Sequence, residues 1–258
     1  MTAAAYIALG VVVLAGLVGL IWRIFSHRQA LPCPSWLGWM VELDNPFTRV
    51  NPARYIVDHL GIEPGMRVLD AGCGPGRVTV PLGRAVGAGG QVTALDVQEG
   101  MISRARQKVG AAGLENVCYI QAELGEGHLP ENAFDRAVLV SVLGEIPNQS
   151  AALEEIYRAL SPGGLLSITE VIFDPHFQGR DSVVRAAEAA GFVEKTFLGR
   201  RLAYTMHVEK PPLRWPSAAE LSPRQRRTRG RLRGRWDTIA DTPCPQGETT
   251  MLKQGVAA

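Results

Sequence analysis

The stretch that decides the fold is Val68-Leu69-Asp70-Ala71-Gly72-Cys73-Gly74-Pro75-Gly76. A short apolar run ends in an acid, and glycines then occupy every second position ahead of a helical pattern. Closely spaced glycines let the backbone approach a ligand, and the N-terminus of the following helix presents unpaired N–H groups to an anion. We therefore predict a strand, a ligand-binding loop and a helix in immediate succession.

This loop departs from the dinucleotide-binding pattern G-x-G-x-x-G at its third glycine. Gly76 comes one residue early, and Arg77 stands where that pattern needs glycine. Asp70 ends the strand, where a pyrophosphate gains nothing from a negative charge. A ligand that carries both a carboxylate and an ammonium group fits better, and the methionine part of S-adenosylmethionine carries both.

A second acid, Asp96, ends the apolar run Val92-Thr93-Ala94-Leu95, twenty residues past Gly76. An acid at this place in a nucleotide-binding fold accepts hydrogen bonds from both ribose hydroxyls. The alternative is an acid in a surface turn, but the spacing favours the ligand role.

Apolar runs alternate with helical patterns from Asn51 to Lys210. The predicted helices span residues 52–60, 76–86, 100–112, 150–160 and 181–190, and the predicted strands span residues 67–71, 91–96, 117–122, 137–142, 165–171 and 202–210. This alternation is typical of an α/β fold with a mostly parallel, doubly wound sheet covered on both faces. The final pair of segments indicates a returning hairpin at one edge.

In their order and spacing these segments resemble the class I S-adenosylmethionine-dependent methyltransferases. The matching segments are the Asp70–Gly76 loop, Asp96, Gln121-Ala122-Glu123, Phe134-Asp135 and Leu160-Ser161-Pro162-Gly163-Gly164. The resemblance covers roughly residues 46–210, and within the superfamily the chain is similar to the group of ubiquinone and menaquinone C-methyltransferases and many small-molecule enzymes. It implies a seven-stranded Rossmann-like sheet, S-adenosyl-L-methionine as cofactor, and direct in-line transfer of a methyl group to a small acceptor.

The resemblance assigns the residues that bind the methionine and ribose parts of the cofactor. Gly72, Gly74 and Gly76 cradle the methionine part. Asp70 lies near its amino group, directly or through water, and Asp96 holds the ribose.

The resemblance also assigns residues to the adenine. Met101 or Val97 packs on the ring. Glu123 stands where the family commonly has an aspartate that reaches the adenine amino group, and its longer side chain alters that contact.

The reacting end is marked by two polar residues, Glu145 and His176. Glu145 lies in the segment Ser141–Pro147 that follows the fourth strand, where several family members place a polar active-site residue. His176 follows the fifth strand, after Glu170 and Asp174, and a histidine there serves as a general base near neutral pH. The alternatives are a helix-start acid and an inert loop histidine. In-line geometry and a deprotonated acceptor suffice if neither residue takes part.

Other function classes find less support in the sequence. Enzymes that methylate nucleic-acid amines carry an Asn/Asp-Pro-Pro-aromatic block after the fourth strand, where this chain has Gly144-Glu145-Ile146-Pro147. Cys33 and Cys244, the cysteines that follow proline, lie outside the domain, so a nucleic-acid C5-methyltransferase is disfavoured too. The cysteines form no C-x-x-C pair, and no metal site is expected. A cofactor-binding scaffold without catalysis remains the alternative from a different class.

The first 28 residues predict a transmembrane anchor. Ala3 to Trp22 are twenty consecutive uncharged residues, long enough as a helix to cross roughly 30 Å of hydrocarbon. A cleaved signal peptide is the competing interpretation, but nothing basic precedes the run, and Arg23 follows where a cleavage site should be. The basic residues Arg23, His27 and Arg28 predict a single span with the catalytic domain on the cytoplasmic side.

Two further segments flank the domain of residues 51–210. Residues 29–50 are a linker, a membrane-proximal stretch or a flap over the active site, three alternatives that the sequence leaves open. Residues 211–258 carry nine basic and four acidic residues, so the net charge of +2 divides into +5 here and −3 before. We expect this Arg- and Pro-rich tail to be disordered, and either to contact anionic lipid or to be a solvated extension.

Overall fold

The computed structural model of this 258-residue chain describes residues 50–212, Thr48, and six helical residues near the N-terminus: Tyr6, Leu9, Gly10, Val13, Leu14 and Leu17. Among these described residues, no helix has the length and hydropathy needed to cross a bilayer. Most of the predicted anchor and linker, and nearly all of the predicted tail, lie outside the described residues, so these three assignments stay predictions.

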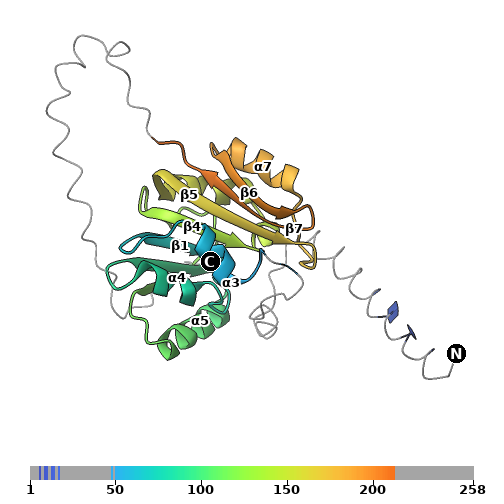
Figure 1. The fold of residues 1–258 in the computed structure, drawn as a ribbon, viewed down its shortest axis with the longest axis horizontal. Coiled ribbons are helices and arrows are strands. Elements are labelled where there is room, and N and C mark those ends of the chain that lie inside the picture. Colours follow the sequence, from blue (N-terminus) through green and yellow to red (C-terminus); the bar gives the residue numbers. More distant parts are fainter. Residues whose placement is uncertain are drawn as a thin grey trace, which may run out of the picture. The chain divides into compact units, whose positions relative to one another are not determined.

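A seven-stranded sheet forms the centre of the domain (Figure 1). Its strands are β1 (Arg67–Ala71), β2 (Gln91–Asp96), β3 (Val117–Gln121), β4 (Phe134–Val140), β5 (Leu160–Val171), β6 (Val193–Arg200) and β7 (Ala203–Glu209). They lie in the order β3-β2-β1-β4-β5-β7-β6. The first five strands pair in parallel, and β7 lies antiparallel between β5 and β6. The predicted mostly parallel sheet with a hairpin at one edge is confirmed.

Helices cover both faces because the strands bury side chains on both sides. The helical elements are α3 (Ala53–His59), α4 (Thr79–Val86), α5 (Glu99–Ala111), the short 3-10 helix η2 (Leu143–Glu145), α6 (Gln149–Ala159) and α7 (Arg180–Ala189). Val68 packs with residues of α3 and α4, whereas its neighbour Leu69 packs with residues of α6 and α7. This alternation makes the central strands continuous apolar runs, as expected for a buried parallel sheet.

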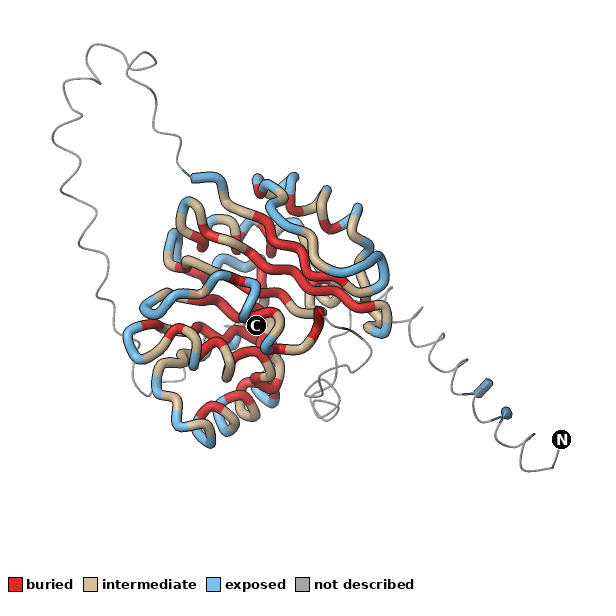
Figure 2. Tube along the Cα trace, viewed as in Figure 1, coloured by how far each residue is buried: buried red, intermediate tan, exposed pale blue. Residues whose placement is uncertain are grey.

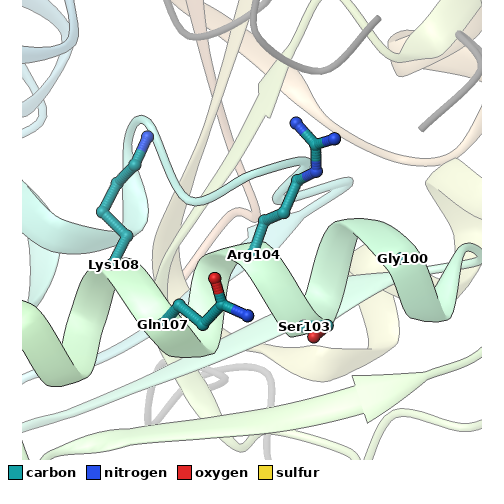
Figure 3. Close-up of a pocket in the computed structure, with 5 residues that line it drawn as sticks. All are labelled: Gly100, Ser103, Arg104, Gln107 and Lys108. Atoms are coloured by element: carbon teal, nitrogen blue, oxygen red, sulfur yellow. The ribbon is translucent and has the colours of Figure 1, made fainter. Parts of the chain in front are cut away.

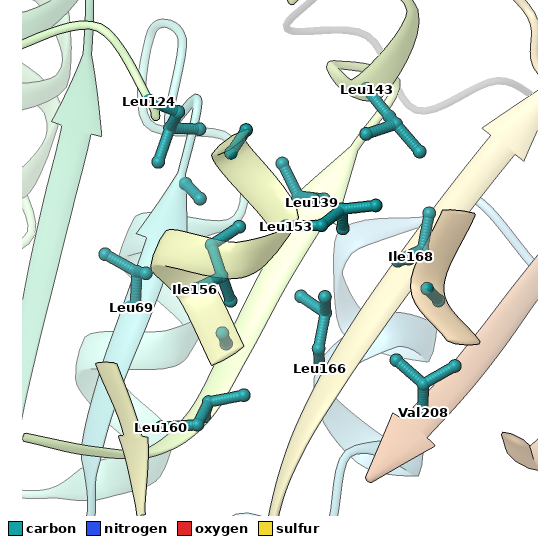
Figure 4. Close-up of a cluster of buried hydrophobic side chains, with 14 of the residues drawn as sticks. Leu69, Leu124, Leu139, Leu143, Leu153, Ile156, Leu160, Leu166, Ile168 and Val208 are labelled. Atoms are coloured by element: carbon teal, nitrogen blue, oxygen red, sulfur yellow. The ribbon is translucent and has the colours of Figure 1, made fainter. Parts of the chain in front are cut away.

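Figure 4 shows the larger of the two cores, where Leu153 and Ile156 of α6 lie over Leu69 and Leu139 of the sheet. The central strands are buried along most of their length in Figure 2, and exposure increases toward the helices and the hairpin edge. This packing holds the carboxyl ends of β1, β2, β4 and β5 at one edge of the sheet. The candidate site residues lie at that edge.

Several element bounds differ from the sequence-based prediction; for example, β4 begins at Phe134 rather than at residue 137, and three other differences have a clear physical reason. The helix expected from Gly76 begins at Thr79, because Gly76 has a left-handed φ of +83° that a helix does not admit. The strand expected from Leu165 begins at Leu160 and passes through an irregular register, so the Pro-Gly-Gly sequence does not interrupt it. Strand β6 has no counterpart among the predicted segments, because it is a largely exposed edge strand with no apolar run.

Candidate active site

The glycine loop after β1 is tied to the end of β2 by backbone hydrogen bonds. The N–H groups of Gly72 and Cys73 both donate to the carbonyl oxygen of Leu95, at 2.8 and 2.9 Å. Gly72, Gly74 and Gly76 have φ angles of +74°, +51° and +83°, a region that side chains rarely adopt. The alternation of glycines therefore follows from a chain that turns sharply between two neighbouring strands.

The three glycines face different surroundings. A Cβ atom on Gly72 would lie 2.5 Å from Cγ2 of Val142, and one on Gly76 would lie 3.0 Å from the Cα of Ala105. A Cβ atom on Gly74 would meet no protein atom within 4 Å. Packing thus requires glycine at the first and third positions, whereas Gly74 leaves an open face that a ligand can approach closely.

Asp96 holds the middle of this loop. Its Oδ2 accepts a hydrogen bond from the N–H of Gly74, and its Oδ1 accepts one from the N–H of Gln98, both at 2.9 Å. The residue is only 8% exposed, and burial raises the pKa of its carboxyl. Each carboxylate oxygen has a second lone pair, so the two oxygens can still accept hydrogen bonds from a diol.

Asp70 is buried at the end of β1, with 3% of its surface exposed. The hydroxyl of Thr79, in the first turn of α4, donates to its Oδ2 at 2.6 Å. Burial raises the pKa of Asp70 to about 6, against the hydrogen bond from Thr79 and the charge of Arg77, which lower it. A cationic group bound beside this carboxylate would favour its charged form.

The adenine-binding candidates differ in exposure. Val97, directly after β2, is 46% exposed, whereas Met101 lies inside α5 with 3% exposed. Glu123 is partly buried in the loop after β3. Of the two apolar candidates, only Val97 presents a surface on which a ring can lie.

A cavity of about 690 Å³ runs along α5, and Figure 3 shows its lining residues: Gly100, Ser103, Arg104, Gln107 and Lys108. Within the described part of the chain its lining comes from this one helix and includes none of the predicted cofactor-binding residues. It begins three residues after Val97, at the end of the site where adenine is expected, and we assign it no separate role.

The structure brings together the two residues predicted for the reacting end. His176 Nδ1 lies 3.7 Å from Oε1 of Glu145 and 3.8 Å from Oδ1 of Asp174, and its side chain is 5% exposed. This approach depends on Gly144, because a Cβ atom there would overlap the carbonyl oxygen of His176. The glycine lets η2 pack directly against the loop that follows β5.

Glu170, at the carboxyl end of β5, is a residue that the sequence reasoning noted without assigning it to the site. It is 1% exposed, its Oε2 accepts from the N–H of Gln178 at 3.0 Å, and its Oε1 is buried without a hydrogen-bond partner. Burial above all, and then the charges of Asp174 and Glu145, raise its pKa to about 8. The signal available in the sequence was its position, since Asp70 and Asp96 also lie at the carboxyl ends of strands.

The sheet order and the glycine loop with its two strand-end acids resemble the Rossmann-like domain of the class I, S-adenosylmethionine-dependent methyltransferases. Residues 68–164 match the family model described as "Methyltransferase domain". Thus the resemblance seen in the sequence is confirmed for the domain.

Curated relatives cover the same part of the chain. It is 38% identical over 118 residues to the "Ubiquinone/menaquinone biosynthesis C-methyltransferase UbiE" of Psychromonas ingrahamii, which covers 45% of this chain and 47% of that protein. It is 34% identical over 115 residues to the "Demethylmenaquinone methyltransferase" of Staphylococcus aureus, with 45% and 47% covered. The chain thus spans about half the length of the curated relatives it matches.

Solved structures share the fold over a longer range. A SAM-dependent methyltransferase from Aquifex aeolicus superposes with a TM-score of 0.62 at 25% identity, covering 69% of this chain and 99% of that one. The [4+2]-cyclase SpnF superposes with a TM-score of 0.58 at 18% identity, covering 70% and 99%. The second likeness shows the fold alone, and it means that this fold does not by itself specify the reaction.

Proposed function

We propose that the chain binds S-adenosylmethionine at the carboxyl ends of β1 and β2 and transfers its methyl group to a small or lipophilic acceptor. A quinone precursor, a lipid or a thiol is the acceptor class we favour, and the printed names of the curated relatives support the first of these. The observation that carries the proposal is the open face at Gly74, flanked by the buried acids Asp70 and Asp96.

The residues at this edge fit the chemical groups of the cofactor. Gly74 leaves room for close approach to the loop backbone, and Asp70 offers a buried carboxylate to an ammonium group. Asp96 has lone pairs for the ribose hydroxyls, and the exposed side chain of Val97 offers an apolar surface to adenine. Glu123 keeps its predicted role toward the adenine amino group. Met101 is buried in α5, so we assign it an indirect role behind the adenine-binding surface rather than a direct contact with the ring.

When bound, the cofactor supplies a methyl group already activated on a sulfonium sulfur. The protein then has to orient the acceptor, exclude water and take up the proton that the acceptor loses as it gains the methyl group. We assign the proton to His176, whose Nδ1 lies within 4 Å of the carboxylates of both Glu145 and Asp174. Two neighbouring carboxylates stabilise the protonated imidazole, so Glu145 supports the base from η2.

We place the protein at a membrane as a single-span protein. The uncharged run Ala3–Trp22 and the basic residues that follow it support an anchor with the domain on the cytoplasmic side. Membranes that contain the full chain should retain it through washes with high salt and alkaline carbonate. Release by high salt alone would contradict a spanning helix.

The enzymatic proposal is tested with the purified full chain. Calorimetry should detect binding of S-adenosylhomocysteine, and radiolabelled S-adenosylmethionine should label a component of a lipid extract or a demethylated quinol. No binding of S-adenosylhomocysteine would reject the cofactor site. Binding without transfer to any extract would favour the alternative, a cofactor-binding protein without methyltransferase activity.

A further inference from the structure

Two residues with exposed apolar side chains, Phe173 and Leu202, lie on neighbouring chain segments at the carboxyl end of β5. They are 67% and 59% exposed, the highest values among the large hydrophobic residues of the range 50–212. Phe173 follows β5 by two residues, and Leu202 lies in the turn between β6 and β7. The N–H of Ile172 donates to the carbonyl oxygen of Leu202 at 2.7 Å, which joins the two segments (Figure 1).

This pair of side chains is flanked by positive charge. Arg200 and Arg201, directly before Leu202, are both exposed. The acid nearest in sequence to Phe173 is Asp174, whose side chain is only 13% exposed and lies 3.8 Å from the ring of His176. We call the set Phe173, Arg200, Arg201 and Leu202 the β5–β7 rim. It combines exposed apolar surface with two cations.

The N-terminal part of the chain enters the domain next to this rim. The hydroxyl of Thr205, in β7, donates to the carbonyl oxygen of Val50 at 3.1 Å. On β6, a Cβ atom at Gly199 would lie 3.1 Å from Cγ1 of Val50. Both contacts flank the turn that carries Leu202. The apolar segment Ala3–Trp22 is therefore connected to the domain beside the β5–β7 rim rather than at the opposite edge of the sheet.

We propose that the β5–β7 rim docks on a bilayer surface that contains anionic lipid. Phe173 and Leu202 enter the boundary between headgroups and acyl chains, and Arg200 and Arg201 contact lipid phosphates. Docking turns the carboxyl edge of the sheet, where Glu145 and His176 lie, toward the membrane. This inference rests on the proposed function, because it gives a lipophilic acceptor a route from the bilayer to the site.

Hydrogen exchange of the full chain tests the docking. The chain is placed in lipid nanodiscs made of phosphatidylcholine alone or of phosphatidylcholine mixed with phosphatidylglycerol, and exchange is followed by mass spectrometry. The amides of residues 172–174 and 200–203 should exchange more slowly in the anionic discs, because each arginine near such a surface strengthens binding roughly fivefold. The loop at residues 87–90, at the opposite edge of the sheet, should exchange equally in both.

The double variant R200E/R201E should lose this lipid-dependent protection. The matched control R84E/R158E makes the same change of net charge at exposed arginines in the last turns of α4 and α6, at the amino edge of the sheet. It should keep the protection. Equal exchange in the two kinds of disc, or protection that survives R200E/R201E, would overturn the proposal. Protection that depends on protein concentration rather than on lipid would assign the rim to a second copy of the chain instead, and would also overturn it.

Cofactor affinity separates this proposal from the proposed function. S-adenosylhomocysteine should bind equally to the wild-type chain, to R200E/R201E and to R84E/R158E, because no residue of the β5–β7 rim belongs to the cofactor site. If the wild-type chain does not bind S-adenosylhomocysteine, the proposed function fails. The exchange data then still decide whether the rim docks on lipid.

Discussion

A buried acid lies at the carboxyl end of each of the strands β1, β2 and β5. The hydrogen bonds that these acids accept differ between β1 and β2 on one side and β5 on the other. Asp96 accepts two backbone hydrogen bonds and Asp70 accepts one from Thr79, so both acids at the cofactor end have donors. Glu170 has one donor, from Gln178, while its other oxygen is buried without a partner. The pKa of Asp70 is about 6, and that of Glu170 is about 8.

This difference indicates two kinds of site at one edge of the sheet. At the proposed cofactor end, protein groups donate hydrogen bonds to both Asp70 and Asp96. The other region, at the carboxyl end of β5, is where we propose that the acceptor binds, and we call it the acceptor end. Three carboxyl groups and an imidazole approach one another there: Glu145, Glu170, Asp174 and His176. Glu170 keeps its proton at neutral pH because burial and the neighbouring charges disfavour its ionised form. Glu170 therefore holds a proton at neutral pH at the end of β5, whereas Asp96 at the end of β2 is bound by two backbone N–H donors.

The largest effect is expected for Glu170→Gln, measured as the free energy of unfolding against pH. The carboxyl has a pKa of about 8 in the folded protein and an ordinary value of 4.5. Below pH 4.5 both states hold the proton, whereas between pH 4.5 and 8 only the folded state does, so wild-type stability falls as pH rises through this window and levels off above it. Glutamine does not titrate, so E170Q should gain stability relative to wild type across the window, by up to roughly 4 kcal/mol.

The control for this experiment is Glu154→Gln, which changes an exposed glutamate of α6. It makes the same chemical change at the protein surface, so the pH-dependent gain in the stability of E170Q should clearly exceed any change in E154Q. A pH-independent difference for E170Q would mean that Glu170 is ionised in the folded protein, and the contrast between the two ends of the sheet would then disappear.

The next effect is expected at the cofactor end. Asp96→Ala removes the acceptor for two backbone N–H groups and for the ribose hydroxyls. We expect a loss of about 2–4 kcal/mol in affinity for S-adenosylhomocysteine, measured by calorimetry. Asp96→Asn keeps one side-chain oxygen, so its affinity for S-adenosylhomocysteine should lie between that of wild type and that of D96A. Unchanged affinity in D96A would remove the assignment of the end of β2 to the cofactor.

The positions of the glycine loop, Asp70 and Asp96 at the ends of β1 and β2 could be predicted from the sequence because local patterns determine them, while their binding of the cofactor stays a prediction. Strands buried on both faces are continuous apolar runs, and Asp70 and Asp96 directly follow such runs. The glycines of the loop are needed where φ is positive, a requirement that acts on single residues. The sequence did not show which of Val97 and Met101 is exposed and which is buried, since this depends on how α5 packs.

The acceptor end depends on contacts between segments that are distant in sequence. Gly144 packs on His176, which is 32 residues away, and no local pattern encodes that contact. The pKa of Glu170 depends on burial and on the charges of Asp174, in the segment after β5, and Glu145, in η2. Strand β6 was missed for a related reason, because its exposed positions include the charged residues Lys195 and Arg200 and the strand contains no apolar run.

A pair of glycine variants should separate the two ends. In Gly144→Ala the new methyl group overlaps the backbone of His176, so the loops must move apart, and we expect a loss of about 1–3 kcal/mol in stability with unchanged affinity for S-adenosylhomocysteine. In Gly74→Ala the methyl group meets no protein atom, so the fold should lose only about 1 kcal/mol through the positive φ while cofactor affinity falls. Denaturant unfolding and calorimetry on both variants provide the measurement. The same pattern in both variants would mean that the two ends are not independent.

The smallest effect is expected for Thr79→Val, which removes the hydroxyl that donates to Asp70 at 2.6 Å. This hydrogen bond lowers the pKa of Asp70 against the larger effect of burial, so its loss should raise that pKa above the present value of about 6. At pH 7 wild-type Asp70 is mostly ionised and the bond is charge-assisted, whereas at pH 5 the carboxyl holds a proton and the bond is weaker. The variant should therefore lose about 1 kcal/mol of stability at pH 7 and less at pH 5, as measured by urea unfolding. Thr79→Ser keeps the hydroxyl and should behave like wild type at both pH values. An equal loss at pH 5 and pH 7 would show that Thr79 acts by packing alone, and the assignment of its hydroxyl as the donor that favours the ionised form of Asp70 would then be wrong.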